Sequence, residues 1–206
     1  MKRLVILALT LALMTAPVYA DWTPKQTQAN QVANIARAMG LPETNPIIVE
    51  ASRIWWEEQA IVEEAKRAEE AQFLADYHTE AVMIAKVMYC EARGISSKKE
   101  LSMIAWTILN RYDAGFASSI SGVITAKNQF AYRSSAKTVN DYGIDLVALA
   151  EDVLLRWHRE NLGETEVGRT LPKGYCYYKG NGKKNRFQQT DNGPGYYDFG
   201  VNPYES

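Results

Sequence analysis

Glu91 is the residue whose type and position best suit chemistry in this sequence. It lies in the segment Tyr89–Gly94, three residues after Met88 and seven after Ile84, so it continues the apolar stripe of the helix predicted there. Burial disfavours a charged carboxylate, and the negative end of a helix dipole disfavours it further. Both effects favour the protonated carboxyl that a general acid needs. The nearby Arg93 leaves open that Glu91 is instead half of a structural ion pair.

Two helices are predicted around this residue. The first has apolar residues at the i, i+3, i+4, i+7 spacing of an amphipathic helix, with Thr79 as its N-cap and Gly94 just beyond its end. The second begins at Ser97, where the segment Ser97–Glu100 has the sequence of a capping box, and ends near Tyr112.

Two further helices and a small hairpin complete the predicted domain. A short helical turn is expected at residues 120–125 and a long helix at 144–158, because of their apolar spacing. Aromatic residues bounded by glycines favour a strand at 175–178, a basic loop follows at 180–185, and a partner strand is expected at 196–201. The expected fold class is therefore helix-dominated α+β with a small C-terminal β-hairpin.

The first 20 residues have the pattern of a secretory signal. Lys2 and Arg3 precede the apolar run Leu4–Met14, and Val18 and Ala20 are small residues at the −3 and −1 positions of a cleavage site. We expect cleavage near Ala20 and export to the periplasm, the cell wall or the extracellular space, with membrane contact only through this segment. The alternative is an uncleaved N-terminal anchor.

Residues 21–76 differ in composition from the rest of the chain. They start with a polar segment that contains three prolines, and a long helix is predicted over residues 47–75, which contain neither Gly nor Pro and are rich in Ala and Glu. Trp55 and Trp56 on this helix are expected to pack onto the following domain. The alternative is that they contact a protein partner, whose identity the sequence does not indicate.

Charge and cysteine content exclude several classes of function. Residues 21–76 hold 5 basic and 10 acidic side chains and residues 77–206 hold 16 and 14, so there is no concentrated basic patch of the kind that binds nucleic acid. The slight positive balance of the second segment is compatible with a polyanionic wall polymer. The two cysteines and two histidines lie at no zinc-ligand spacing, so neither a metal nor another cofactor is expected.

Residues 80–206 resemble the cell-wall hydrolase family typified by the spore-cortex-lytic enzyme SleB. The matching blocks are Ala85–Gly94 (AKVMYCEARG), Ile104–Arg111 (IAWTILNR), Ile120–Ile124, Asn128–Phe130 and Cys176–Tyr178. The resemblance implies a lysozyme-like catalytic domain over residues 77–206, with peptidoglycan as its substrate and Glu91 as its acid. Position 90 is usually Gly in this family and is Cys here, which leaves open a disulfide between Cys90 and Cys176.

The resemblance also implies a reaction. Glycoside hydrolysis normally uses two carboxylates, but no neighbourhood marks Asp113, Asp141 or Asp145 as catalytic. A single-acid lytic transglycosylation between N-acetylmuramic acid and N-acetylglucosamine is therefore expected, which leaves a 1,6-anhydromuramyl end. The alternatives are a hydrolytic muramidase on the same fold and a non-catalytic wall-binding or morphogenetic module.

Six side chains in or beside the matching blocks are predicted to hold the glycan. Their amides suit hydrogen bonds to N-acetyl and hydroxyl groups, and their aromatic rings suit stacking on sugars. They are Asn110, Gln129, Phe130, Tyr132, Tyr177 and Tyr178. For Asn110 the alternative is a hydrogen bond to a loop backbone, and for Phe130 it is a place in the core.

Overall fold

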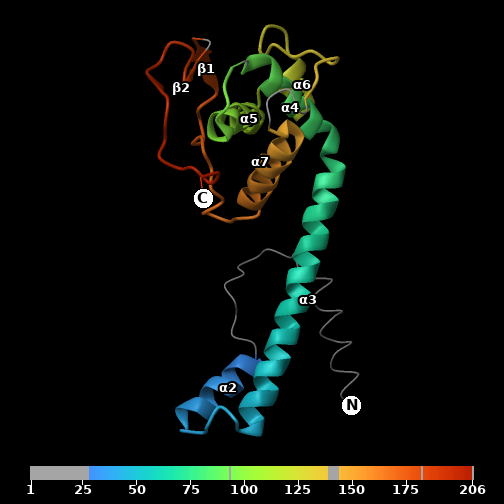
Figure 1. Cartoon of the computed structure of the whole chain (residues 1–206), viewed down its shortest axis with the longest axis vertical. Helices are drawn as coiled ribbons and strands as arrows, with labels where there is room; N and C mark the ends of the chain where they lie inside the picture. Colours follow the sequence, from blue (N-terminus) through green and yellow to red (C-terminus); the bar gives the residue numbers. More distant parts are fainter. Residues whose placement is uncertain (1–27, 93, 139–143, 182, 206) are drawn as a thin grey trace. The chain divides into compact units, whose positions relative to one another are not determined.

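The chain forms two compact units, one ending at Glu69 and one beginning at Glu70, in a computed structural model that describes residues 28–92, 94–138, 144–181 and 183–205. The expected signal segment, Arg93 and Asp141 lie outside the described residues. The described part is helix-dominated with a small antiparallel sheet, as predicted for the α+β class (Figure 1). No helix within it combines the length and the apolar character that crossing a membrane requires.

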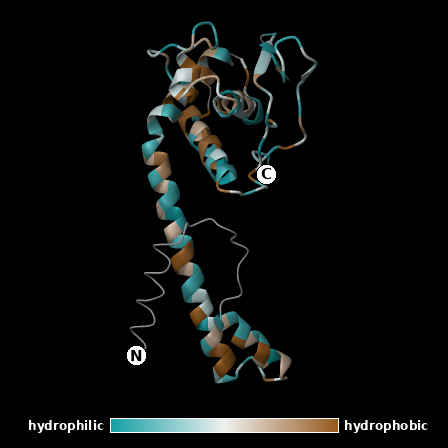
Figure 2. Cartoon of the chain, turned by 180° about the vertical axis from the view of Figure 1, so that it is seen from behind, coloured by the Kyte–Doolittle hydropathy of each residue, from teal (hydrophilic) through white to brown (hydrophobic). Residues whose placement is uncertain are grey.

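The first unit consists of helix α2 (Gln28–Ala38) and most of helix α3 (Pro46–Asp76), whose last turns belong to the second unit. The long helix predicted at 47–75 is therefore present. Its surface carries close ion pairs such as Arg67 Nε to Glu63 Oε1 at 3.1 Å, which are exposed and contribute little stability. Trp56 is 64% exposed, and its expected packing onto the following domain stays a prediction. Figure 2 shows apolar residues scattered along α2 and α3.

The second unit is built around helix α5 (Lys98–Asp113), which is buried without interruption from Leu101 to Arg111. Helices α4 (His78–Glu91), α6 (Ile120–Thr125) and α7 (Leu146–Asn161) all pack against α5, and α4 also packs along α7. Figure 1 shows α5 between these helices and the sheet. Because the middle turns of α5 have no solvent-facing side, this helix is held in the core along its length. It therefore positions the residues of its C-terminal end, Asn110 and Arg111 among them.

Two helix starts differ from those predicted. Thr79 is not an N-cap, because α4 begins at His78 directly after α3, and Tyr77 connects the two helices without a side-chain cap. The backbone explains why none is needed: Tyr77 N donates to Phe73 O, and Ala81 N donates to Tyr77 O. Helix α7 begins after Asp145, whose carboxylate accepts hydrogen bonds from two backbone N–H groups of the first turn.

The sheet has three short antiparallel strands in the order β1 (Tyr177–Gly180), β2 (Asn185–Gln188), β3 (Gly195–Tyr196). The predicted hairpin is present, but its partner strand is wrong: Tyr178 pairs with Phe187 of β2, and β3 pairs only with β2. The sequence of β2 is mostly polar, so it lacks the apolar signal of a strand. Two of its residues, Asn185 and Gln188, are nevertheless buried, and Gln188 Nε2 donates to Gly193 O in the following turn.

The predicted capping box at the start of α5 is half formed. Ser97 Oγ accepts from the Glu100 N–H at 3.3 Å, as expected. The Glu100 side chain does not turn back to Ser97, and it accepts from the backbone N–H of Asn185 in β2. Burial raises the pKa of Glu100 above its usual value, although this hydrogen bond and the nearby Lys184 oppose the shift.

This shift predicts how the variant Glu100→Gln behaves. Because the pKa of Glu100 is higher in the folded state than in the unfolded state, the folded state loses stability as the pH rises through that interval. Gln keeps an acceptor for Asn185 and cannot ionise. We therefore expect Glu100→Gln to be at least as stable as the unsubstituted chain at pH 7, with this relative gain absent below the unfolded-state pKa of about 4.3.

Thermal unfolding at pH 3 and pH 7 measures this difference. The same substitution at the exposed Glu166 is the control, which we expect to show no comparable dependence on pH. A gain for Glu100→Gln that is larger at pH 3 than at pH 7 would contradict the expectation.

Candidate functional site

Glu91 is the last residue of α4, and three segments of the second unit meet at its side chain. The backbone N–H of Ala131, in the loop after α6, donates to Glu91 Oε1. The hydroxyl of Tyr178, on β1, donates to the same carboxylate. The side chain is half-buried, so the site holds the carboxylate from two directions and leaves part of it accessible.

Tyr178 contacts Glu91 through its hydroxyl group. Burial raises the pKa of Tyr178 far above its usual value, and the adjacent Glu91 carboxylate raises it further, while Arg111 opposes the shift. The phenol therefore stays protonated and remains a donor throughout the physiological pH range. Its ring packs on the buried Phe187 at 5.7 Å between centroids. These contacts give Tyr178 a role in holding Glu91, and the predicted stacking on sugar remains a prediction.

A cavity of about 250 Å³ has Arg111 in its wall, and Glu91 is near enough for its charge to act on this residue. Two residues predicted to hold the glycan, Gln129 and Tyr177, line it together with residues that the prediction did not include. The full lining is Arg111, Phe116, Val123, Ala126, Gln129 and Tyr177. Glu91 itself does not line the cavity. Its two hydrogen-bond donors are close to lining residues in the chain, because Tyr178 directly follows Tyr177 and Ala131 lies two residues after Gln129.

Arg111 is the residue of this site that the sequence reasoning missed. It is only 6% exposed, and its Nε donates to the carbonyl of Cys176 at 2.6 Å while Nη1 donates to Gln129 Oε1 at 3.0 Å. A signal was present in the sequence, because Arg111 lies three residues after Ile108 and seven after Ile104 on the apolar stripe of its helix. The same spacing had drawn attention to Glu91.

The two remaining predicted aromatic contacts, Phe130 and Tyr132, are half-buried against the core and do not line the cavity. The Phe130 ring lies under the guanidinium of Arg111, with Cζ 4.5 Å from the ring centroid. This geometry is that of a cation–π contact. Phe130 therefore supports the cavity wall from behind, which agrees with its alternative place in the core.

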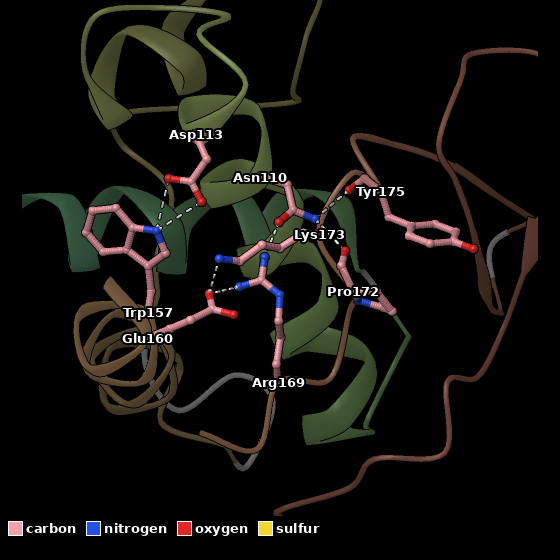
Figure 3. A network of polar contacts seen from close by, with 8 residues as sticks. All are labelled: Asn110, Asp113, Trp157, Glu160, Arg169, Pro172, Lys173 and Tyr175. Atoms are coloured by element: carbon pink, nitrogen blue, oxygen red, sulfur yellow. Dashed lines mark hydrogen bonds and ion pairs between the residues drawn. The ribbon is translucent and has the colours of Figure 1, made fainter. Parts of the chain in front are cut away.

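Asn110 belongs to a polar network away from the cavity (Figure 3). It is 3% exposed, and its Nδ2 donates to the carbonyls of Pro172 and Tyr175, both at 2.9 Å. Its Oδ1 accepts from Arg169, which also pairs with Glu160 at 2.6 Å. Both polar atoms of the amide are thus engaged within the protein, so the structure favours the alternative in which Asn110 holds a loop.

The other carboxylates considered as catalytic partners have structural contacts. Asp113 accepts from Trp157 Nε1, at 3.1 and 3.2 Å to its two oxygens (Figure 3). Asp145 caps α7. Asp141 lies outside the described residues. Neither of the two described carboxylates is placed as a second acid beside Glu91.

The two cysteines are free thiols in the structure, so the disulfide left open by the sequence is not formed. Cys176 is buried, and burial raises the pKa of its thiol. Its backbone carbonyl accepts from Arg111. Among the described residues, no group of three or more His, Cys, Asp or Glu side chains is arranged to hold a metal ion.

Comparison with family models, with curated proteins and with solved structures finds no match for this chain. The site itself therefore carries the functional argument. It combines one accessible carboxyl group, a phenol that stays protonated and donates to it, and a cavity with an amide and a guanidinium in its wall. Chemically, this set suits proton transfer to and from a ligand that is rich in hydroxyl and amide groups.

Proposed function

We propose that this chain cleaves the glycan strand of peptidoglycan between N-acetylmuramic acid and N-acetylglucosamine, by lytic transglycosylation with Glu91 as the single general acid and base. The observation that carries the proposal is the half-buried Glu91 carboxyl, bonded by Ala131 and Tyr178 next to a cavity that includes Gln129 and Tyr177. The structural engagement of Asp113 and Asp145 supports a mechanism with one acid.

In this mechanism Glu91 gives its proton to the oxygen that links the two sugars, and the bond from that oxygen to C1 of muramic acid breaks. The 6-hydroxyl of the same muramic acid then attacks C1 and returns a proton to Glu91, so a 1,6-anhydro ring forms and no water is consumed. The Tyr178 hydroxyl donates to the carboxylate that exists between the two steps. A donor aimed at a charge that develops during reaction accelerates it.

The fold that we propose for the second unit is lysozyme-like. A core helix that ends in the acidic residue and a small antiparallel sheet whose first strand bears Tyr178 are both compatible with this proposal. The chain would act outside the cytoplasm, after cleavage near Ala20. N-terminal sequencing of the protein recovered from its producing cell tests that cleavage, and a start at Met1 would contradict it.

Mass spectrometry of the products from purified sacculi tests the reaction. We expect soluble muropeptides with 1,6-anhydromuramyl ends, which are lighter by one water than the products of hydrolysis. Reducing ends without the anhydro product would instead support the hydrolytic muramidase. Binding to sacculi without any release of product would support the non-catalytic module.

The variant Tyr178→Phe tests the contact to Glu91. It keeps the ring packed on Phe187 and removes only the hydroxyl that donates to the carboxylate. We expect the rate to fall by about tenfold or more, since a hydrogen bond to a charged group contributes roughly 1.5–3 kcal/mol.

The rate of muropeptide release from purified sacculi measures this effect. Tyr112→Phe is the matched control, because that tyrosine is half-buried on the core, does not line the cavity and was not predicted to hold the glycan. An unchanged rate for Tyr178→Phe would show that its hydroxyl does not assist Glu91.

A further inference from the structure

The cavity wall contains a buried cation whose hydrogen-bond partners, among the residues that the structure describes, are all neutral. Arg111 is 6% exposed, and its hydrogen bonds in the described part of the chain go to the backbone oxygen of Cys176 and the amide oxygen of Gln129. Its Nη2 group donates to no described residue. A guanidinium has five N–H donors in a planar fork, so this one keeps donor capacity on the side that lines the cavity.

Two partly buried arginines of this unit are paired with carboxylates. Arg169 lies 2.6 Å from Glu160, and Arg156 lies 2.8 Å from Asp152. Buried charges are expected to be paired, because an unpaired charge in a low-dielectric environment is costly. Burial lowers the pKa of Arg111, nearby groups that include the Glu91 carboxylate oppose this shift, and the guanidinium stays protonated at neutral pH. Arg111 thus differs from Arg169 and Arg156 in that no described carboxylate is hydrogen-bonded to it, although the charge of Glu91 acts on it from nearby.

The surroundings of Arg111 would strengthen its attraction for an anion. Aromatic rings lie around the guanidinium, with distances from Cζ to the ring centroid of 4.5 Å for Phe130, 5.6 Å for Tyr177 and 6.0 Å for Phe116. They exclude water from the charge, and an electrostatic interaction is stronger where water is excluded. Phe116 is 47% exposed, so it combines a place in the cavity wall with access to solvent.

The size of the cavity indicates what part of a ligand it takes. Its volume of about 250 Å³ lies below the roughly 300–1,000 Å³ of sites that enclose a whole small molecule. It therefore fits a substituent of a larger ligand. Its apolar lining residues, Val123 and Ala126, suit the carbons that carry a charged group.

We propose that Arg111 and this cavity form a subsite for a carboxylate carried by the glycan strand, close to Glu91. This inference rests on the proposed function for the identity of the strand. The shared ligand chemistry is a carboxylate on a short aliphatic chain, which a guanidinium binds through two parallel N–H···O bonds. Peptidoglycan offers two sources: the lactyl carboxylate of muramic acid that has lost its stem peptide, and the carboxylates of the stem peptide itself.

Two matched pairs of ligands test the proposal without turnover. The full-length Glu91→Gln chain is titrated with N-acetylmuramic acid and its carboxamide, and with N-acetylmuramoyl-L-alanine and its carboxamide, and binding is followed by NMR chemical shifts. In at least one pair we expect the acid to bind about tenfold more tightly than the neutral amide. A preference within the first pair identifies the lactyl source and one within the second identifies the stem peptide. Equal affinity within both pairs overturns the proposal.

Variants then assign the preference to Arg111. Arg111→Gln should abolish the discrimination between acid and amide, and Arg111→Lys, which keeps the charge, should retain part of it. Arg133→Gln removes an exposed positive charge from the loop that contains Ala131 and should leave the discrimination intact. Circular dichroism checks that each variant folds. If Arg111→Gln does not fold, the other two variants decide. Loss of the preference for the acid in Arg133→Gln, or an unchanged preference in Arg111→Lys, overturns the assignment.

Failure of this inference is distinguishable from failure of the proposed function. If the unsubstituted chain releases anhydromuropeptides from sacculi but its Glu91→Gln form does not distinguish acids from amides, the carboxylate subsite is wrong and the reaction stands. If no product is released and the acids still bind preferentially, the subsite stands and the chain is a binding module.

Discussion

Glu91→Gln is expected to lower the rate of muropeptide release by roughly a hundred- to ten-thousandfold, the contribution usual for a general acid or base. Gln has the same shape as Glu and keeps an acceptor oxygen for the Ala131 N–H and the Tyr178 hydroxyl. It cannot transfer a proton to the bond between the sugars. The loss should therefore fall on the chemical step, with substrate binding largely unchanged.

The stability of this variant should move in the opposite direction. Glu91 ends α4, where a negative charge faces the negative end of the helix dipole. A neutral side chain removes that repulsion, so we expect Glu91→Gln to unfold at the same temperature as the unsubstituted chain or slightly above it. A large loss of activity without a loss of stability would separate a catalytic role from a structural one.

Glu80→Gln is the matched control, because it makes the same chemical change in the first turn of the same helix. We expect it to release muropeptides at the rate of the unsubstituted chain. Both rates are measured by liquid chromatography of the soluble products at saturating sacculus concentration. Release by Glu91→Gln within about twofold of the unsubstituted rate would show that another group supplies the proton.

The helices of the second unit could be predicted because each carries a regular apolar stripe. The predicted turn at residues 120–125 coincides with α6 (Ile120–Thr125), and the predicted second helix coincides with α5 to within one residue at its end. Strand β2 could not be predicted, since its buried polar residues depend on partners from other segments, such as Glu100. No local pattern encodes a contact across 85 positions of the chain.

The candidate site shows the same division between local and distant information. Glu91 could be found because its own helix places a carboxyl on an apolar stripe. The contacts that define its surroundings come from Ala131 and Tyr178, which lie far along the chain. Residue type alone suggested that Tyr178 stacks on sugar, whereas its hydroxyl points to Glu91. The direction of a side chain on a strand depends on the register of that strand. This register was unknown from the sequence, because the partner strand was predicted wrongly.

Asn110 and Gln129 show the difference between what residue type predicts and what distant contacts decide. Both are amides predicted to bind substrate, but the structure gives them different surroundings. Asn110→Ala removes both donors to the loop carbonyls of Pro172 and Tyr175 and one acceptor of Arg169, all in a buried network (Figure 3). Unpaired buried polar groups are costly, so we expect the free energy of unfolding to fall by about 2–5 kcal/mol.

The effect should extend to the site through the backbone. The loop that Asn110 holds leads directly into β1, which carries both Tyr177 in the cavity wall and Tyr178 on Glu91. Asn110→Ala should therefore also lower activity, but only as far as the folded population or the position of β1 changes. Urea unfolding followed by tryptophan fluorescence measures the first quantity, and sacculus digestion well below the unfolding midpoint measures the second.

Gln129→Ala is the counterpart at an exposed position of the cavity. It removes one acceptor of Arg111, so we expect a loss of stability of about 1 kcal/mol or less. The rate of glycan cleavage should fall by more than this loss of stability explains. If instead Asn110→Ala keeps full stability and weakens binding of the glycan, Asn110 is a substrate ligand, and the buried network seen around it does not hold in solution.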